Sequence, residues 1–370
     1  MRATEATASA KHAIEICNAC RYCEGYCAVF PAMELQRDFT DTDMSYLANL
    51  CHNCNGCYHA CQFAPPHEYG INLPKHFAEV RLESYAAYAW PAPLARVFQR
   101  NGLVVGVLSA LAITLVFVLT ALLVSPERLF AAHTGPGAFY ALIPWGVMAT
   151  VAGITFLFSA LALLMGARAF WIDTRTSLSG PVTLPALGRA IADVATLRYL
   201  GGAGEGCNDA DASFSLARRH AHHAVFYGFL LCFAATSVAT VFDHYLGWIA
   251  PYSLYSPPVL LGTAGGVLML VGCVGLTRIK LRTDPAPVAR RVLGGDYAFL
   301  GLLFLTAATG LLLLLLRDTA AMGVLLALHL GVILSLFLVL PYGKFVHGIY
   351  RGTALLKAAI ERRRNQLLAG

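Results

Sequence analysis

Charged residues are scarce in this chain. They make up 13% of its 370 residues, while 57% of the residues are hydrophobic. The net charge is only +6, which excludes a strongly basic nucleic-acid-binding surface. A soluble protein is excluded as well, because the apolar stretches after residue 101 would need a very large soluble core to bury them.

A second absence concerns the N-terminal segment. Residues 1–16 lack the apolar core of a secretory signal peptide. We therefore expect a reducing compartment, in which disulfides are rare and free thiols persist. The chain also shows no P-loop and no pairing of a nucleophile with a base, so the sequence predicts a component of a redox system rather than a stand-alone enzyme.

Cysteine, by contrast, is abundant and regularly spaced. Eight of the eleven cysteines lie in two copies of Cys-x2-Cys-x2-Cys-x3-Cys, a spacing typical of [4Fe–4S] clusters. In two-cluster ferredoxins the fourth cysteine of each run binds the other cluster. The spacing therefore predicts two [4Fe–4S] clusters, one on Cys17, Cys20, Cys23 and Cys61, the other on Cys51, Cys54, Cys57 and Cys27.

Zinc fits these runs less well. A structural zinc site takes four ligands, usually as two Cys-x2-Cys pairs, whereas each run here carries a third and a fourth cysteine at ferredoxin offsets. Cys207 has no neighbouring cysteine and is not expected to be a ligand. Cys232 and Cys273 lie in apolar stretches and are expected to pack as small hydrophobic residues.

Six apolar stretches are long enough to cross a membrane as helices. They cover residues 102–124, 139–165, 221–243, 256–277, 296–316 and 320–341. Of the 27 lysines and arginines, all but Arg128 and Arg317 lie in the segments that alternate topology places on the side of the N-terminus. Because cytoplasmic loops are enriched in Lys and Arg, the sequence predicts a bacterial inner-membrane protein with both termini and the clusters on the cytoplasmic side.

Histidines mark the third and sixth spans at matching levels. His223 and His347 are expected near the cytoplasmic face, and His244 and His329 towards the outside. Ionisable side chains within a membrane are costly and mark functional sites. The pattern predicts haem b held by paired imidazoles, with one haem on His223 and His347 and a second on His244 and His329 left open. His222 is an alternative inner ligand, and an interfacial role for it and for His244 stays open.

The segment from His329 to His347 resembles the last haem helix of the nitrate reductase gamma subunit. In that family a proline lies between two histidine ligands at the same offsets, and Pro341 stands there in this sequence. His223 and the Gly-Phe pair that follows it are similar to the facing helix, but Phe233 replaces a second histidine. The resemblance implies that His223 and His347 bind haem, while a second haem would depend on His244.

Nearly the whole chain resembles the tricarballylate (citrate) utilisation protein B family. The resemblance rests on the cysteine-rich head, the glycine-rich Gly201–Asn208 loop, the Arg218–His223 segment with its pattern Arg-Arg-x2-His-His, and the haem helices. It implies a subunit that reoxidises the reduced FAD of tricarballylate dehydrogenase and passes the electrons to membrane quinone. The glycine-rich loop lacks the strand–turn–helix setting of a nucleotide site, so we expect it to pack near a cluster, a haem edge or the partner flavoprotein.

Together these observations predict an all-α fold. Residues 1–74 would form an α-helical two-cluster ferredoxin-like head, 75–100 a connecting helix, 101–343 a six-helix transmembrane haem-binding bundle, and 344–370 a basic cytoplasmic tail. A heterodisulfide-reductase-like membrane subunit with another redox partner is an alternative, but it would favour a further cysteine-rich motif. A redox-regulated transporter is a third hypothesis, although transporters usually show internal topology repeats.

Overall fold

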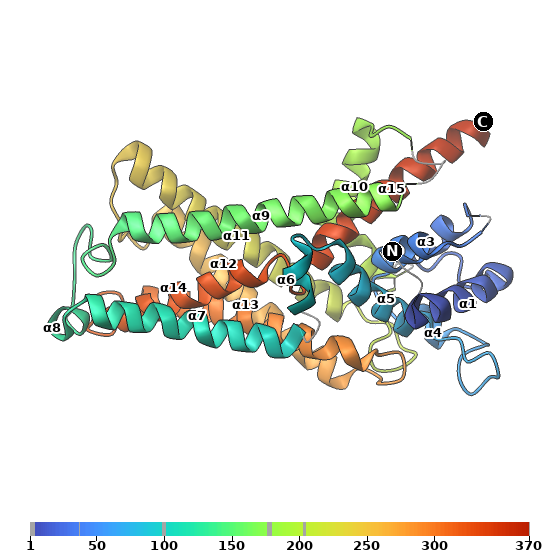
Figure 1. Cartoon of the computed structure of the whole chain (residues 1–370), viewed down its shortest axis with the longest axis horizontal. Helices are drawn as coiled ribbons and strands as arrows, with labels where there is room; N and C mark the ends of the chain where they lie inside the picture. The colour runs from blue at the N-terminus through green and yellow to red at the C-terminus, as the bar shows by residue number, and fades with distance from the viewer. Residues whose placement is uncertain (1–3, 37, 98–100, 176–179, 203–204, 370) are drawn as a thin grey trace.

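The computed structural model describes residues 4–36, 38–97, 101–175, 180–202 and 205–369. Within these ranges the chain folds into helices and contains no strand, only one isolated β-bridge between Cys207 and Ser215. Long helices run side by side, and the N-terminal helices gather at one end of them together with the C-terminal helix (Figure 1). The predicted all-α fold is confirmed.

Four short helices carry the cysteine runs. They are α1 (Glu5–Cys20), α2 (Val29–Met33), α3 (Asp41–Leu50) and α4 (Gly56–His59). Threonine caps start α1 and α3, because the Thr4 hydroxyl accepts the backbone N–H of Thr7 and the Thr40 hydroxyl accepts that of Asp43. Both runs therefore lie at helix ends and in the irregular segments between them, where neighbouring thiols can point towards a common centre.

Helices α5 (Leu73–Tyr88) and α6 (Ala92–Val97) connect this head to the bundle. The side chain of Asn72 caps α5 by accepting the backbone N–H of Lys75 at 3.3 Å, and its amide donates to the carbonyl of Ala286 at 2.9 Å. The start of α5 is thus fixed to the loop before the fifth long helix. Residues 98–100 of the predicted connecting segment lie outside the described residues.

The last helix, α15 (Val346–Ala369), packs into the head. Its Tyr350, Ala354 and Leu355 are buried in one hydrophobic core with Ile14 and other head residues. Tyr46 of α3 adds a hydrogen bond from its hydroxyl to the Glu361 carboxylate at 3.0 Å. The part of α15 up to Glu361 therefore belongs to the same packed unit as the cysteine runs.

Six helices are long and apolar enough to cross a membrane, as the sequence predicted. They are α7 (Asn101–Leu123), α9 (Trp145–Asp173), α11 (Ala217–Leu246), α12 (Pro257–Arg282), α13 (Arg290–Leu316) and α14 (Met322–Val339). Their exposed leucines, valines and phenylalanines form an apolar surface around the bundle. The chain has the character of a multi-pass membrane protein.

Helices α11 and α12 pack closely through small residues. A Cβ atom on Gly265 would lie 2.7 Å from the carbonyl oxygen of Gly228 and 2.8 Å from the amide nitrogen of Cys232. A Cβ atom on Gly272 would lie 2.7 Å from the amide nitrogen of Val225. Close backbone contact through small residues is typical of membrane helices, and here it fixes which side of α11 faces the bundle.

The segment between α9 and α11 lies at the head end of the bundle (Figure 1). It contains α10 (Leu184–Ala195) and the 3₁₀-helix η2 (Arg198–Gly201), followed by the glycine-rich loop. One short helix completes the described order: α8 (Pro126–Leu129) joins α7 to α9 at the opposite end. Gly204 of the glycine-rich loop lies outside the described residues.

Candidate electron-transfer site

Cys17, Cys20, Cys23 and Cys61 lie together around one small cavity and form the first cysteine group. Burial, and then the neighbouring Cys61, Cys23 and Cys20, raise the pKa of the Cys17 thiol to about 12. Burial and Cys61 likewise raise the pKa of Cys23 to about 11. The side-chain amide of Gln62 points at the sulfur of Cys20 from 3.8 Å. Four thiols from both sequence runs therefore share one centre.

Cys27, Cys51, Cys54 and Cys57 surround another small cavity and form the second cysteine group. Burial, with Cys54 as the next cause, raises the pKa of the Cys27 and Cys57 thiols well above the ordinary value. The sulfur of Cys23 lies 4.0 Å from the carbonyl oxygen of Cys57, so the two groups are in contact. Cys61 thus lies with thiols of the first run and Cys27 with thiols of the second, while Cys57 lines both cavities. The crosswise ligation of clusters stays a prediction.

These groups suit a cluster better than a single ion. Within the described ranges, no three His, Cys, Asp or Glu side chains are close enough together to hold one metal ion. In a cubane cluster each thiolate binds a different iron atom, so the sulfurs stand further apart than around one zinc ion. Four thiols around one small cavity match the number of thiolate donors in such a cluster. The presence of two clusters stays a prediction.

The glycine-rich loop packs against the second cysteine group. Cys207 is fully buried with Leu200 and Cys54, and its thiol donates to the carbonyl of Leu200 at 3.3 Å. The N–H of Asn208 donates to the carbonyl of Cys54 at 2.8 Å. Gly206 has a φ of 119°, and a Cβ atom there would lie 2.3 Å from a backbone oxygen, so the turn requires glycine. Of the placements expected for this loop, the structure shows the one beside a cysteine group.

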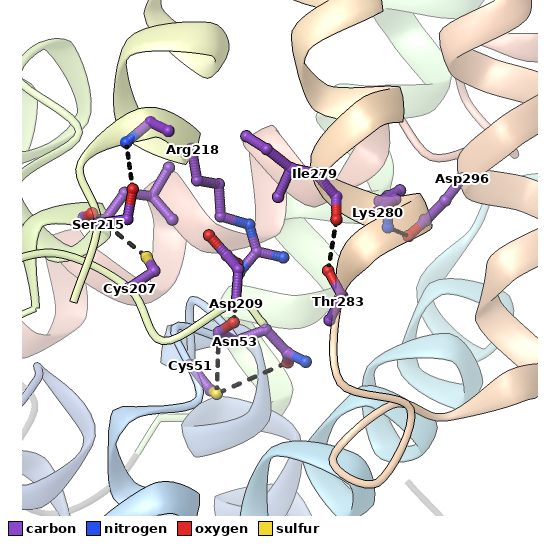
Figure 2. A network of polar contacts seen from close by, with 12 residues as sticks. Cys51, Asn53, Cys207, Asp209, Ser215, Arg218, Ile279, Lys280, Thr283 and Asp296 are labelled. Carbon is purple, nitrogen blue, oxygen red and sulfur yellow. Dashed lines mark hydrogen bonds and ion pairs between the residues drawn. The ribbon is translucent and has the colours of Figure 1, made fainter. Parts of the chain in front are cut away.

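Three arginines converge on the backbone of the second cysteine group. Arg81 of α5 and Arg351 of α15 both donate to the carbonyl of Cys51, at 3.0 Å and 2.8 Å. Arg218 of α11 donates to the carbonyl of Asn53 at 2.5 Å, and Figure 2 shows it reaching from the bundle towards this loop. Sequence reasoning noted Arg218 only as part of the family pattern and missed Arg81 and Arg351, because the three side chains meet only in the folded chain.

A cavity of about 350 Å³, which we call the junction cavity, lies where the head meets the bundle. His52 and Asn53 of the second cysteine group form part of its wall, and apolar residues of α12 and α13 such as Leu276 and Phe299 form another part. Asp296 is the one acidic residue of the described wall. The basic residues of the wall are Arg81, Arg218, Lys280, Arg290, Arg291, Lys344 and Arg351.

His222 and His347 face each other across this cavity. Their ring centroids are 6.0 Å apart and the rings are nearly perpendicular. The Nδ1–H group of His347 donates to the carbonyl oxygen of Lys344 at 2.5 Å. The Nε2 atom of the same ring is therefore left free. Burial, followed by the charge of Arg351, lowers the pKa of His347 well below its ordinary value, so the ring is neutral and keeps a lone pair. The Nδ1 atom of His222 is buried without a hydrogen-bond partner among the described residues.

His223 was predicted to pair with His347, whereas the ring that the structure places beside His347 is that of His222. The His223 ring lies 5.7 Å from that of Tyr227 on the side of α11 that faces the segment before η2. Arg219 and Tyr227 both bind carbonyls of that segment, at Thr196 and Ala195. Successive side chains of a helix point about 100° apart, so His222 and His223 lie at nearly the same level of α11 but face different neighbours.

The outer pair is not brought together. His329 of α14 packs against α13, where its Nδ1 lies 2.9 Å from the hydroxyl of Thr309. That hydroxyl donates to the carbonyl of Leu305 at 2.7 Å, so the ring N–H is the donor to Thr309. His244 is exposed, and its ring lies edge-on to Trp145 at 4.5 Å. Thr309 therefore fixes the Nδ1 atom of His329, and the second haem that the sequence left open stays untested.

A buried ion triad adjoins the inner histidines. The Asp296 carboxylate binds the Lys280 ammonium at 2.5 Å and the Lys344 ammonium at 2.6 Å. The carbonyl of the same Lys344 accepts from His347, so the triad links α12 and α13 to the ring position (Figure 2 shows Lys280 and Asp296). Sequence reasoning missed the triad, although an acidic residue at the edge of a predicted span is the signal that could have found it.

Comparison with known proteins shows the family of the chain. The family model described as "Citrate utilization protein B" matches residues 96–367, and "Citrate utilization protein B Fer4-like domain" matches residues 10–87. The chain belongs to the citrate utilization protein B family. One member, citrate utilization protein B of Escherichia coli, is 47% identical over 368 residues, which cover 98% of this chain and 94% of that protein. No solved structure matches the chain.

The family matches divide the chain as the structure does. The Fer4-like match covers all eight cysteines of the two groups and ends within α5. The longer match covers the six long helices and most of α15. The described residues of this family member thus combine a head of the iron–sulfur type with a membrane bundle.

Proposed function

We propose that this chain is a membrane electron-transfer subunit that takes electrons from the reduced FAD of a cytoplasmic dehydrogenase and delivers them to quinone. The observation that carries the proposal is a chain of adjacent sites. The first cysteine group contacts the second, and the second shares His52 and Asn53 with the junction cavity. This order leads from the surface of the head, where the Cys20–Gln62 contact is exposed, to the ends of the membrane helices.

The eight thiols would hold two [4Fe–4S] clusters, which supply one-electron transfer when bound. The residues of the head do the rest. Helix caps and the shared core with α15 hold the two groups in contact, and the backbone N–H of Asn208 fixes the carbonyl of Cys54. Partial burial of the thiols limits their contact with water, which raises the cost of any unpaired charge there.

His222 and His347 would hold one haem b. Two neutral imidazoles on opposite walls are the donor set of bis-histidine haem, and Lys344 fixes the orientation of His347 through its carbonyl. The apolar wall around Leu276 and Phe299 suits a macrocycle, and the basic wall suits its carboxylates. We propose a single haem, because His244 and His329 share no site in the described structure.

The dehydrogenase would be tricarballylate dehydrogenase, which the family resemblance implies. Its reduced flavin gives up two electrons and two protons, and one quinone takes up the same number. The distribution of Lys and Arg supports an inner-membrane protein with both termini and the cysteine groups in the cytoplasm. With the cysteine groups on that side, the head is the part of the chain that a cytoplasmic flavoprotein reaches.

Metal analysis and mixing experiments test the proposal. The purified protein should contain about eight non-haem iron atoms and about eight acid-labile sulfides per chain, as two [4Fe–4S] clusters require. Anaerobic mixing with reduced tricarballylate dehydrogenase should produce the absorbance of reduced haem b. A protein that contains zinc in place of iron would contradict the proposal, as would a haem that no reduced flavoprotein reduces. Reduction by a different dehydrogenase alone would contradict the choice of partner and leave the electron path in place.

A further inference from the structure

The two cysteine groups differ in how guanidinium groups meet their backbone. Neither described cavity wall contains a Lys, Arg, Asp or Glu side chain. At the first group, the exposed Arg21 donates to the carbonyl of Asn18 at 3.0 Å, whereas less exposed guanidinium groups meet the backbone of the second group. Arg81 is only 6% exposed and donates to the carbonyls of Ala48 and Cys51 at 2.8 Å and 3.0 Å. Arg351 donates to the same Cys51 carbonyl at 2.8 Å.

These two arginines carry charge that the described structure does not neutralise. Arg218, the third arginine at this loop, pairs with Asp209 at 3.3 Å (Figure 2). The Asp296 carboxylate is already shared by Lys280 and Lys344. Among the described residues no carboxylate forms an ion pair with Arg81 or Arg351. Two positive charges therefore remain beside the second cysteine group in a partly dehydrated setting.

We propose that Arg81 and Arg351 raise the reduction potential of the cofactor on the second cysteine group above that of the first, and so make the second group the point where electrons leave the head. The inference rests on the proposed function, because it assumes a cluster on each group. Reduction adds one electron and thus one negative charge. A nearby positive charge stabilises the reduced form more than the oxidised form, and the effect is larger away from bulk water.

The position of the arginines determines the direction of electron flow that this difference in reduction potential favours. The second group, and not the first, shares its wall with the junction cavity. A higher potential at the second group drives each electron from the first group towards the cavity. Arg81 and Arg351 line the cavity as well, so the same charges attract electrons to the membrane side of the head.

A redox titration followed by electron paramagnetic resonance tests the inference on the wild-type protein first. Two cluster signals are expected, and the signal of the second group should have the higher midpoint potential. A Cys20→Ser variant identifies the signal of the first group, because only that signal changes. The reverse order of potentials in the wild-type protein would overturn the inference.

Variants then separate charge from structure. In Arg351→Gln the one-electron reduction constant of the second group should fall about tenfold, which corresponds to a shift of about 59 mV, while the first group keeps its potential. Arg351→Lys keeps the charge and should keep most of the potential. Arg189→Gln removes the same charge from exposed α10, where it pairs with Asp193, and should move neither potential. Arg81→Gln provides a second charge deletion if Arg351→Gln does not fold.

Iron analysis of each sample keeps the two proposals apart. A chain without iron would contradict the proposed function itself. A chain with full iron and sulfide content, in which Arg351→Gln and Arg81→Gln leave the second potential unchanged or move both potentials equally, would contradict only this inference. If the arginines had a purely structural role, Arg351→Lys would lose as much stability as Arg351→Gln and Arg81→Gln. None of these variants would then shift the potential of the second group selectively.

Discussion

The two ends of the membrane bundle carry histidines at matching levels, yet only one end brings a pair together. At the head end, His222 and His347 face each other across the junction cavity. At the opposite end, His244 is exposed beside Trp145, and His329 donates to Thr309 between α13 and α14. The difference teaches that spacing along helices predicts the depth of a residue, whereas helix packing decides which neighbour it faces.

Loss of an inner ligand should have the largest effect. His347→Ala and His222→Ala should each remove most of the bound haem, because a bis-histidine site loses one of its two ligands. His223→Ala, the matched control one residue along α11, should keep the haem. The absorbance of the reduced protein per chain measures both. Loss of haem in His223→Ala and retention in His222→Ala would restore the pairing predicted from sequence.

The ion triad at the head end should matter far more than its counterpart at the other end. Asp296→Asn leaves Lys280 and Lys344 with a neutral partner in a buried site, which should cost about 3–5 kcal/mol of stability. Asp318→Asn removes an exposed partner of Arg317 at the opposite end and should cost about 0–1 kcal/mol. Thermal unfolding in detergent compares the two. Equal losses would show that the triad is not the anchor of the junction.

The contact between α11 and α12 should connect stability with haem content. Gly265→Ala places a Cβ against the backbone of α11 and should destabilise the bundle by about 1–3 kcal/mol. It should also lower haem content, because a displaced α11 moves His222. Gly153→Ala on α9 meets no atom within 4 Å and serves as the control. Reduced stability with unchanged haem binding would separate helix packing from the histidine position.

The outer histidines should have the smallest effect. His244→Ala should leave haem content and stability nearly unchanged, because the ring is exposed. His329→Ala should cost about 0.5–1.5 kcal/mol for the lost hydrogen bond to Thr309, again without loss of haem. Quantified haem per chain decides the point. Loss of about half of the haem in either variant would establish the second haem that the sequence left open.

Much of the fold could be predicted from the sequence because its signals are local. Long apolar runs identify membrane helices by length alone, and the Cys-x2-Cys-x2-Cys-x3-Cys spacing determines which thiols can meet. The candidate site was harder, because Arg81, Arg218 and Arg351 come from three separate helices. No periodicity in the sequence links them. Only the packing of α5, α11 and α15 around Cys51 reveals their role.

The choice between His222 and His223 shows the same limit in one step. Both lie at the same depth of α11, so hydropathy cannot separate them. Gly228, Gly265 and Gly272 fix the rotation of α11 against α12, and this rotation turns His222 to the cavity. A pattern of small residues along both helices is present in the sequence and could have predicted the rotation.

One measurement tests the central claim most directly: the rate of haem reduction after anaerobic mixing with the reduced dehydrogenase, in the wild-type protein and in a Cys54→Ala variant that keeps its haem. The account predicts rapid reduction of the wild-type haem. It predicts a large loss of rate in the variant, because the second cysteine group lies between the head surface and the cavity. Haem reduction at an unchanged rate in Cys54→Ala would contradict an electron path through the head.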